Sequence, residues 1–236
     1  MRAAGLRRGE SVAAETRVVT LEEVMANAEI RDLIEQANAH LGAMGFTEHG
    51  QRHVRLVSRI SYNILKRLGF PEREAELAAI AGYLHDIGNV VSRHDHPETG
   101  AAMVYVLLRE MGMPPQELGK VLGAIGNHEE PYGEVVNNIG AAVILADKSD
   151  VHRTRVRNTD PATFDIHDRV NYAVLKSFLD VRPEARAVNL ELQIDTAISP
   201  VMEYFEIFLS RMVMCRRAAS FLGCQFELTI NNTRLL

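Results

Sequence analysis

The stretch Gly82–Asn89, GYLHDIGN, places a histidine and an aspartate side by side where an apolar segment runs into glycine. Residues 72–87, EREAELAAIAGYLHDI, become more apolar toward their end, which predicts a helix that is buried in its second half and stops at Gly88. His85 and Asp86 then lie near the end of that helix. The pair fits a helix terminus or part of a metal centre, and two ligands alone cannot hold a metal.

Length, composition and charge narrow the class of protein. The chain has 236 residues, of which 47% are hydrophobic and 24% charged, with a formal net charge of −5. These values are typical of a soluble globular protein with one domain and an appendage, or with two small domains. Because no large basic field is present, an extended nucleic-acid surface is not expected.

The cysteines and the apolar segments indicate the compartment. Cys215 and Cys224 are the two cysteines, and their spacing matches neither a CxxC motif nor a cysteine-rich zinc site. A disulfide framework is not expected, so a reducing cytoplasm fits best. No segment approaches the roughly 20 apolar residues of a membrane span, and we expect no membrane association.

Helical patterns fill most of the chain before Pro183. Thr20 and Glu23 form the pattern of a capping box, which predicts a helix start after a frayed tail of residues 1–19. Helices in series with short loops predict an all-α domain over residues 20–182. The expected helices cover residues 21–42, 50–68, 72–87, 100–112, 116–127, 138–153 and 167–180.

The pattern changes after Pro183. Residues 187–195, AVNLELQID, alternate strictly between apolar and polar side chains. A long helix is expected at residues 201–223, and residues 224–232 after it alternate again. This predicts a C-terminal strand-helix-strand unit over residues 183–236, so the fold class is mainly α with a small α+β appendage. The unit is marginal alone. We expect it either to complete a homodimer or to cover the core of its own chain.

Six residues spread along the helical part can act together as metal ligands. A helix bundle builds metal sites from side chains on facing helices, and each of these residues falls on a separate predicted element except the neighbouring pair. Neutral imidazoles and carboxylates suit first-row divalent ions such as iron, manganese, cobalt, nickel or zinc. The carboxylate of Asp86 has one oxygen for each of two ions. The six are His53, His85, Asp86, His96, His128 and Asp147.

Other roles remain open for several of these residues. His53 faces the apolar side of its helix, as a core histidine would, and His49 lies four residues before it on the same face. His94 competes with His96 for the same role. Asp147 follows an apolar run, where a buried carboxylate needs a metal or a cationic partner such as Lys148.

The order H, HD, H, H, D resembles the HD-domain superfamily of metal-dependent phosphohydrolases, and HDIGN resembles its HDIG variant, over roughly residues 45–155. The resemblance implies a helical domain and a first metal held by His53, His85, Asp86 and Asp147. It also implies that Asp86 bridges to a second metal on His96 and His128. Asn127 and the stretch PYG depart from the pattern of the cyclic-dinucleotide phosphodiesterases in this superfamily.

The implied activity is cleavage of a phosphoester or phosphoanhydride of a small nucleotide-like substrate by metal-activated water. The candidates for catalytic carboxylates are Asp86 and Glu129. Substrate phosphate would be bound by guanidinium and ammonium groups. A di-iron oxygenase and a non-catalytic nucleotide sensor share the ligand set and stand as alternatives. The expected substrate-binding cations are Lys148, Arg153, Arg155 and Arg93.

Overall fold

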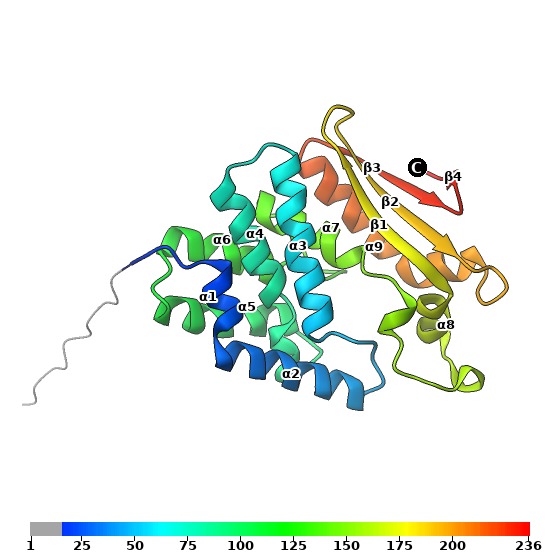
Figure 1. Cartoon of the computed structure of the whole chain (residues 1–236), viewed down its shortest axis with the longest axis horizontal. Helices are drawn as coiled ribbons and strands as arrows, with labels where there is room; N and C mark the ends of the chain where they lie inside the picture. The colour runs from blue at the N-terminus through cyan, green and yellow to red at the C-terminus, as the bar shows by residue number, and fades with distance from the viewer. Residues whose placement is uncertain (1–15) are drawn as a thin grey trace, which may run out of the picture.

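The computed structural model describes residues 16–236, which form a bundle of helices with a small sheet on one side (Figure 1). The mainly α fold with a small C-terminal α+β unit confirms the predicted fold class. The α-helices are α1 (Leu21–Ala26), α2 (Ala28–Ala43), α3 (Gln51–Arg67), α4 (Glu72–Leu84), α5 (His96–Glu110), α6 (Pro115–Gly126), α7 (Asn138–Lys148), α8 (Ile166–Ala173) and α9 (Val201–Phe221). Short 3-10 helices lie at η1 (Ile87–Val90), η2 (Arg153–Arg155) and η3 (Pro161–Thr163).

The residues before the first helix already pack on the bundle. Val19 is fully buried, and the backbone N–H of Arg17 donates to the carbonyl of Gly112 at 2.8 Å. The prediction of a tail up to residue 19 is therefore wrong for residues 16–19. Residues 1–15 of that predicted tail lie outside the described residues.

The predicted capping box at Thr20 is present. The Thr20 side chain accepts from the backbone N–H of Glu23, and the Glu23 carboxylate accepts from the backbone N–H of Thr20. The helix that follows is shorter than predicted, because it ends at Ala26. Asn27 has an extended backbone, and its side chain caps the next helix by accepting from Ile30 N. A single helix over residues 21–42 is thus wrong, and asparagine's preference for the N-cap position explains the break.

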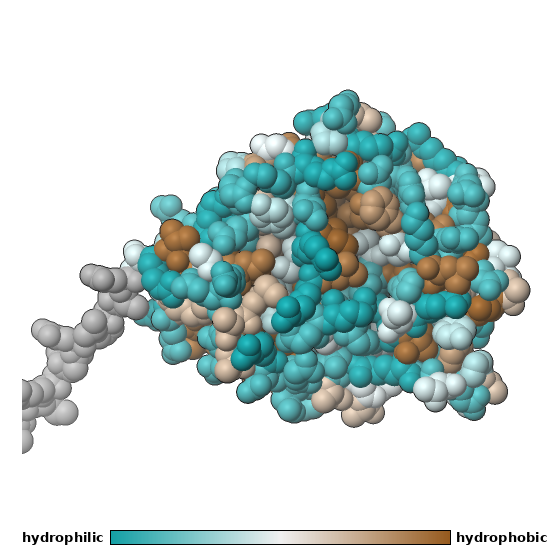
Figure 2. Space-filling model, in the orientation of Figure 1, coloured by the Kyte–Doolittle hydropathy of each residue, from teal (hydrophilic) through white to brown (hydrophobic). Residues whose placement is uncertain are grey.

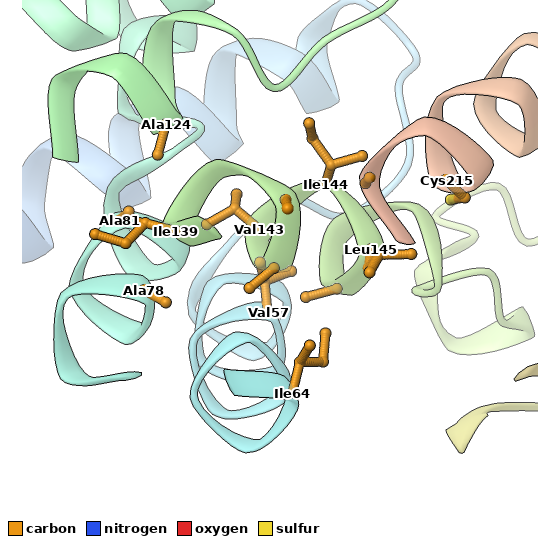
Figure 3. Close-up of a cluster of buried hydrophobic side chains, with 14 of the residues drawn as sticks. Val57, Ile64, Ala78, Ala81, Ala124, Ile139, Val143, Ile144, Leu145 and Cys215 are labelled. Atoms are coloured by element: carbon orange, nitrogen blue, oxygen red, sulfur yellow. The ribbon is translucent and has the colours of Figure 1, made fainter. Parts of the chain in front are cut away.

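Helix α7 runs through the middle of the bundle and is buried on every side from Ile139 to Ala146. Its neighbours are α3, α4, α6 and α9, which surround it with small and branched apolar side chains (Figure 3). The end of α7 therefore delivers Asp147 and Lys148 into the interior of the protein. Neighbouring side chains labelled in Figure 3 are Val57, Ile64, Ala78, Ala81, Ala124 and Cys215.

The sheet has the strand order β1-β2-β3-β4. Strands β1 and β2 are antiparallel, β2 and β3 are parallel with α9 as the crossover, and β3 and β4 are antiparallel. The apolar members of the alternating pattern at Val188, Leu190 and Leu192 are buried, as predicted. The strands are β1 (Val174–Arg182), β2 (Ala187–Ile194), β3 (Gln225–Ile230) and β4 (Thr233–Arg234).

Strand β1 replaces the second half of a predicted helix. The expected helix over residues 167–180 ends at Ala173, and the chain continues directly as a strand whose Leu179 is paired with Leu190 of β2. Pairing with β2, which follows after a short turn at residues 183–186, overrides the local helical pattern of these residues. The sheet thus begins before the predicted boundary at residue 183.

Helix α9 lies between the sheet and the bundle. It packs against α7 on one side and against β2 and β3 on the other, which explains why apolar residues surround so much of its girth. Met202, Leu209 and Phe221 remain exposed on it by 67%, 58% and 47%. The unit thus covers its own chain's core, and a homodimer stays a prediction. Among residues 16–236, none of the helices combines the length and apolar character needed to cross a membrane.

Candidate metal centre

Asp86 lies at the centre of a group of buried imidazoles and turns a different carboxylate oxygen to each side. Its Oδ2 is 3.3 Å from Nε2 of His85 and 3.6 Å from Nε2 of His53. Its Oδ1 is 3.3 Å from Nε2 of His96 and 3.9 Å from Nε2 of His128. Oδ2 is buried and accepts no hydrogen bond from the described residues. A buried carboxylate oxygen in this position requires a cation.

Asp147, at the end of α7, completes the group on the Oδ2 side. Its Oδ1 is 3.4 Å from Nε2 of His53 and 3.6 Å from Nε2 of His85, and these two nitrogens are 3.3 Å apart. Ligand atoms about 2.1 Å from a shared ion lie roughly 3.4 Å apart at tetrahedral angles. His53 and His85 therefore both lie at ligand spacing from Oδ2 of Asp86 and from Oδ1 of Asp147. The sets of three residues that could hold an ion include His53, His85 and Asp86, and also His85, His128 and Asp147.

The Oδ1 side of Asp86 carries a second, smaller group. Nε2 of His96 and Nε2 of His128 are 3.2 Å apart, and both rings are buried. Together with Asp86 they form a second set of three ligand atoms that could hold an ion. Histidine and carboxylate donors fit first-row divalent ions on both sides of Asp86.

The outer ring nitrogens orient the four imidazoles. Each Nδ1 lies within hydrogen-bond distance of an oxygen acceptor, so Nε2 of each ring faces the centre and can donate its lone pair to an ion once it carries no proton. The acceptors are Asp150 Oδ2 at 2.7 Å for His53, Gly82 O at 2.9 Å for His85, Arg93 O at 3.1 Å for His96 and Ile125 O at 2.6 Å for His128.

Gly88 allows the two halves of the centre to meet. Helix α4 ends at Leu84, earlier than predicted, and Gly88 lies within the 3-10 turn that follows. A Cβ atom at Gly88 would lie 2.1 Å from the carbonyl oxygen of His96 and 2.5 Å from the amide nitrogen of Gly100. No side chain fits there, so glycine permits the close approach of α5 that brings His96 to Asp86.

The structure also separates the histidines whose roles the sequence leaves open. His94 is exposed, whereas His96 is buried against Asp86, so His96 is the residue that faces the centre. His49 is half-buried beside the centre, with its ring centroid 5.4 Å from that of His53. Its Nδ1 lies 2.7 Å from the carbonyl of Thr47.

The pKa values of the buried groups show that the carboxylates of the centre favour a positive charge beside them. Burial disfavours charge on His85, but the carboxylates of Asp86 and Asp147 outweigh burial and raise the pKa of His85 to about 10. Burial would also raise the pKa of Asp86, yet His85 and His96 hold that pKa well below its usual range. Burial and the neighbouring cations lower the pKa of His128 to about 3. A proton on His85 thus supplies part of the charge that an ion would bring.

Residues 50–160 match the family model described as HD domain. This stretch of the chain is an HD domain. The matched residues include all six predicted ligands and end before α8 and the sheet.

Two relatives are reported for comparison. An uncharacterised protein of Methanocaldococcus jannaschii is 26% identical over an alignment of 159 residues, which covers 58% of this chain and 61% of the relative. The chain therefore spans less than two thirds of that relative's length. A solved structure, a predicted HD superfamily hydrolase from an uncultured Thermotogales bacterium, is 26% identical with a TM-score of 0.43 and covers 57% of this chain and 75% of that chain.

Lys148 lies inside the HD domain and is surrounded by carboxylates. Its Nζ is 2.9 Å from Asp147 Oδ2 and 3.0 Å from one carboxylate oxygen each of Glu129 and Glu130, and the side chain is 1% exposed. Burial would lower the pKa of Lys148, but these carboxylates raise it, so the charge is permanent. An ammonium group held in this way organises the ligand Asp147. Its predicted contact with substrate phosphate is therefore not favoured.

Arg211 joins the HD domain to the C-terminal unit, and sequence patterns did not single it out. Arg211 lies on α9, and its Nε donates to Glu130 Oε1 at 3.0 Å. Its guanidinium lies 4.5 Å from the ring centroid of Phe208. Of the two glutamates that contact Lys148, Glu130 thus has a partner outside residues 50–160, in Arg211. The other, Glu129, accepts from Arg93, which lies within those residues. Local pattern cannot connect an arginine on this helix to residue 130.

Asp150 is a second residue that the sequence interpretation missed. It is 3% exposed and accepts from His53 Nδ1, from both terminal nitrogens of Arg52 and, through its backbone carbonyl, from Arg155 Nη1. Burial would raise the pKa of Asp150, but Arg155 and His53 lower it, so the carboxylate stays charged. Its position three residues after Asp147, on the same side of the chain, is the signal that could have found it.

Two of the predicted phosphate-binding arginines lie away from the mouth of the centre. Arg155 is buried, and its guanidinium donates to the backbone carbonyls of Glu48 and Asp150. Arg153 is half-buried, with its guanidinium 4.9 Å from the ring centroid of Tyr172. Both contacts stabilise the loop after α7, so the predicted substrate role of these two residues is not favoured.

Arg93 stands at the opening of the HD domain's metal centre. It lines a cavity of about 290 Å³ together with His96 and Glu129. Its Nη2 donates to Glu129 at 2.5 Å, and its Nη1 lies 3.1 Å from the ring nitrogens of His96. Tyr132 lies on the rim of the same cavity and is 89% exposed. Of the four predicted substrate-binding cations, Arg93 is the one that lines this cavity, and its contact with substrate stays a prediction.

Proposed function

We propose that the protein is a metal-dependent hydrolase that cleaves a phosphoester or phosphoanhydride bond of a small nucleotide-like substrate. The observation that carries this proposal is the two-sided arrangement of Asp86. Each of its oxygens faces its own group of buried histidines, and Oδ2 has no hydrogen-bond donor within the described residues. This is the donor arrangement that pairs of ions use in hydrolytic sites.

His53, His85, Asp86 and Asp147 would hold the first ion, and Asp86, His96 and His128 the second. Iron, manganese, cobalt, nickel and zinc all suit such donors. When bound, two divalent ions lower the pKa of coordinated water and neutralise charge on phosphoryl oxygens. The buried Nδ1 contacts keep the four imidazoles in place for this purpose.

The mouth supplies the groups that would meet the substrate. Arg93 places a permanent positive charge beside His96 at the cavity, where a planar guanidinium suits phosphate oxygens. Burial would raise the pKa of Glu129, but Lys148 and Arg93 lower it, so Glu129 stays charged and is a weaker proton acceptor than an ordinary carboxylate. The exposed ring of Tyr132 offers a surface on which a nucleobase can stack.

A metal-reconstitution assay tests the proposal. Protein freed of metal is loaded separately with manganese, iron, cobalt, nickel or zinc and offered a generic phosphodiester, a phosphomonoester and diadenosine tetraphosphate. We expect phosphate or nucleotide release with at least one ion. The Asp86→Asn variant should lose it, and the control Asp32→Asn, on the exposed surface of α2, should keep it.

Two results would contradict the hydrolase proposal. Oxygen uptake by the iron-loaded protein without hydrolysis of any of the three substrates would indicate an oxygenase. Tight binding of a nucleotide without turnover under any metal would indicate a sensor.

A further inference from the structure

A groove separate from the metal centre lies between α3 and β1. It has a volume of about 630 Å³, within the range of small-molecule sites, and none of the six metal ligands lines it. Figure 2 shows apolar surface at the bottom of this hollow, between the two elements as they lie in Figure 1. Its walls are formed by Leu56, Ile60, Ile64, Phe178, Leu179 and Val181.

The charges of the groove favour an anion. Arg52 and Arg67 lie at its two ends, roughly 22 Å apart along α3. Arg52 is already bound by Glu48 and Asp150, whereas Arg67 is half-exposed and its nearest carboxylate, on Asp180, is 3.9 Å away. The end at Arg67 therefore has positive charge available, and apolar side chains follow directly along the groove.

The other end of the groove touches the support of a metal ligand. Arg52 and Asp150 both line the groove, and Arg52 Nη2 donates to Asp150 Oδ2 at 2.8 Å. The same oxygen accepts from His53 Nδ1 at 2.7 Å. A molecule that fills this end of the groove thus contacts Arg52 and Asp150. Asp150 in turn accepts from His53, whose Nε2 faces Oδ2 of Asp86.

We propose that this groove is a second binding site, for a small amphipathic anion with its acidic head at Arg67 and its apolar body between α3 and β1. A body of about 20 Å, the length of an extended sixteen-carbon chain, reaches from Arg67 to Arg52 and Asp150, and binding of such a molecule is coupled to metal binding at His53. Coupling of this kind is reciprocal, so an ion changes the affinity of the anion by the same factor. The binding itself does not depend on the hydrolase activity proposed above.

The test uses decanoate and the neutral decan-1-ol as probes of the full chain, with displacement of the fluorescent anion 8-anilinonaphthalene-1-sulfonate as the signal. We expect decanoate to bind more tightly than decan-1-ol. The Arg67→Gln variant should weaken decanoate about fivefold, the worth of one partly exposed charge pair, and leave decan-1-ol unchanged. Phe178→Ala should weaken both probes. The control Arg59→Gln, an exposed arginine on α3 outside the groove, should change neither.

The coupling is measured with hexadecanoate, whose extended chain of about 20 Å reaches from Arg67 to Arg52, as the ratio of its affinities with and without manganese. We expect a ratio different from one in the unmodified chain and close to one in Asp150→Asn, which removes the charged link to His53. Equal affinities in the unmodified chain would overturn the coupling. Absence of decanoate binding, or binding that neither Arg67→Gln nor Phe178→Ala weakens, would overturn the site. A dimer in sedimentation that the probe dissociates would assign the groove to a second copy and also overturn it.

Discussion

Replacing Asp150 with asparagine should weaken metal binding without removing a metal ligand. The substitution keeps the shape of the side chain. It removes the negative charge of the carboxylate whose Oδ2 accepts from His53 Nδ1 at 2.7 Å. Loss of an outer partner of a metal-bound histidine typically costs 10- to 100-fold in metal affinity, or about 1.4–2.8 kcal/mol. We expect a loss in this range, confined to the ion on the Oδ2 side of Asp86.

The same substitution should also lower the stability of the metal-free protein. It leaves Arg155, which is buried, and Arg52, which is 38% exposed, without their shared carboxylate. Breaking a buried pair costs about 3–5 kcal/mol, and the exposure of Arg52 reduces this to roughly 1–3 kcal/mol. Urea unfolding of the metal-free variant gives this value, and competition with a chelator gives the metal affinity.

The control for Asp150→Asn is Asp32→Asn, which removes an exposed carboxylate on α2. It should change neither metal affinity nor stability by a measurable amount. Metal affinity of Asp150→Asn within twofold of the unmodified chain, in a protein that still folds, would refute the reasoning that Asp150 positions His53.

Three other perturbations test separate parts of the centre. His128→Ala should reduce metal content from two ions per chain to one, as measured by elemental analysis, while two ions retained would contradict the assignment. Arg211→Gln leaves Glu130 without its α9 partner and should lower the thermal midpoint by several degrees, whereas Arg217→Gln on the exposed side of α9 should not. Because metal must displace the proton of His85, whose pKa is raised to about 10, metal affinity should rise up to tenfold per pH unit above pH 7. Because the folded protein holds the His85 proton more tightly than the unfolded chain, the metal-free protein should lose stability as pH rises from about 6.5 to about 10. Metal affinity and unfolding free energy that do not change with pH would contradict the raised pKa of His85.

The capping box and the strand after Pro183 could be predicted because their signals are local. Thr20 with Glu23 marks a helix start by its own hydrogen bonds, and the strict alternation around Leu190 marks a strand. The order of histidines and aspartates along separate helices indicates a shared site, and the structure brings Asp86 and its partners together with the spacing of metal ligands.

The features that the sequence interpretation missed depend on contacts that the local pattern of a segment does not contain. Residues 174–180 have a pattern that fits a helix, and only pairing with β2 makes them a strand. Lys148 and Arg155 were expected to bind phosphate because of their charge, but burial among carboxylates and carbonyls decides their partners. Arg211 reaches Glu130 only because α9 packs on α7, which no local pattern predicts.

The most direct test of the central claim is a crystal structure of the metal-loaded protein with anomalous scattering measured at the absorption edge of the bound ion. We expect two anomalous peaks, one on each side of Asp86 and roughly 3.5–4 Å apart. The first should lie among His53, His85 and Asp147, and the second beside His96 and His128. A single peak on the Oδ2 side, or none at either position, would contradict a bridging Asp86 and the two-ion centre built on it.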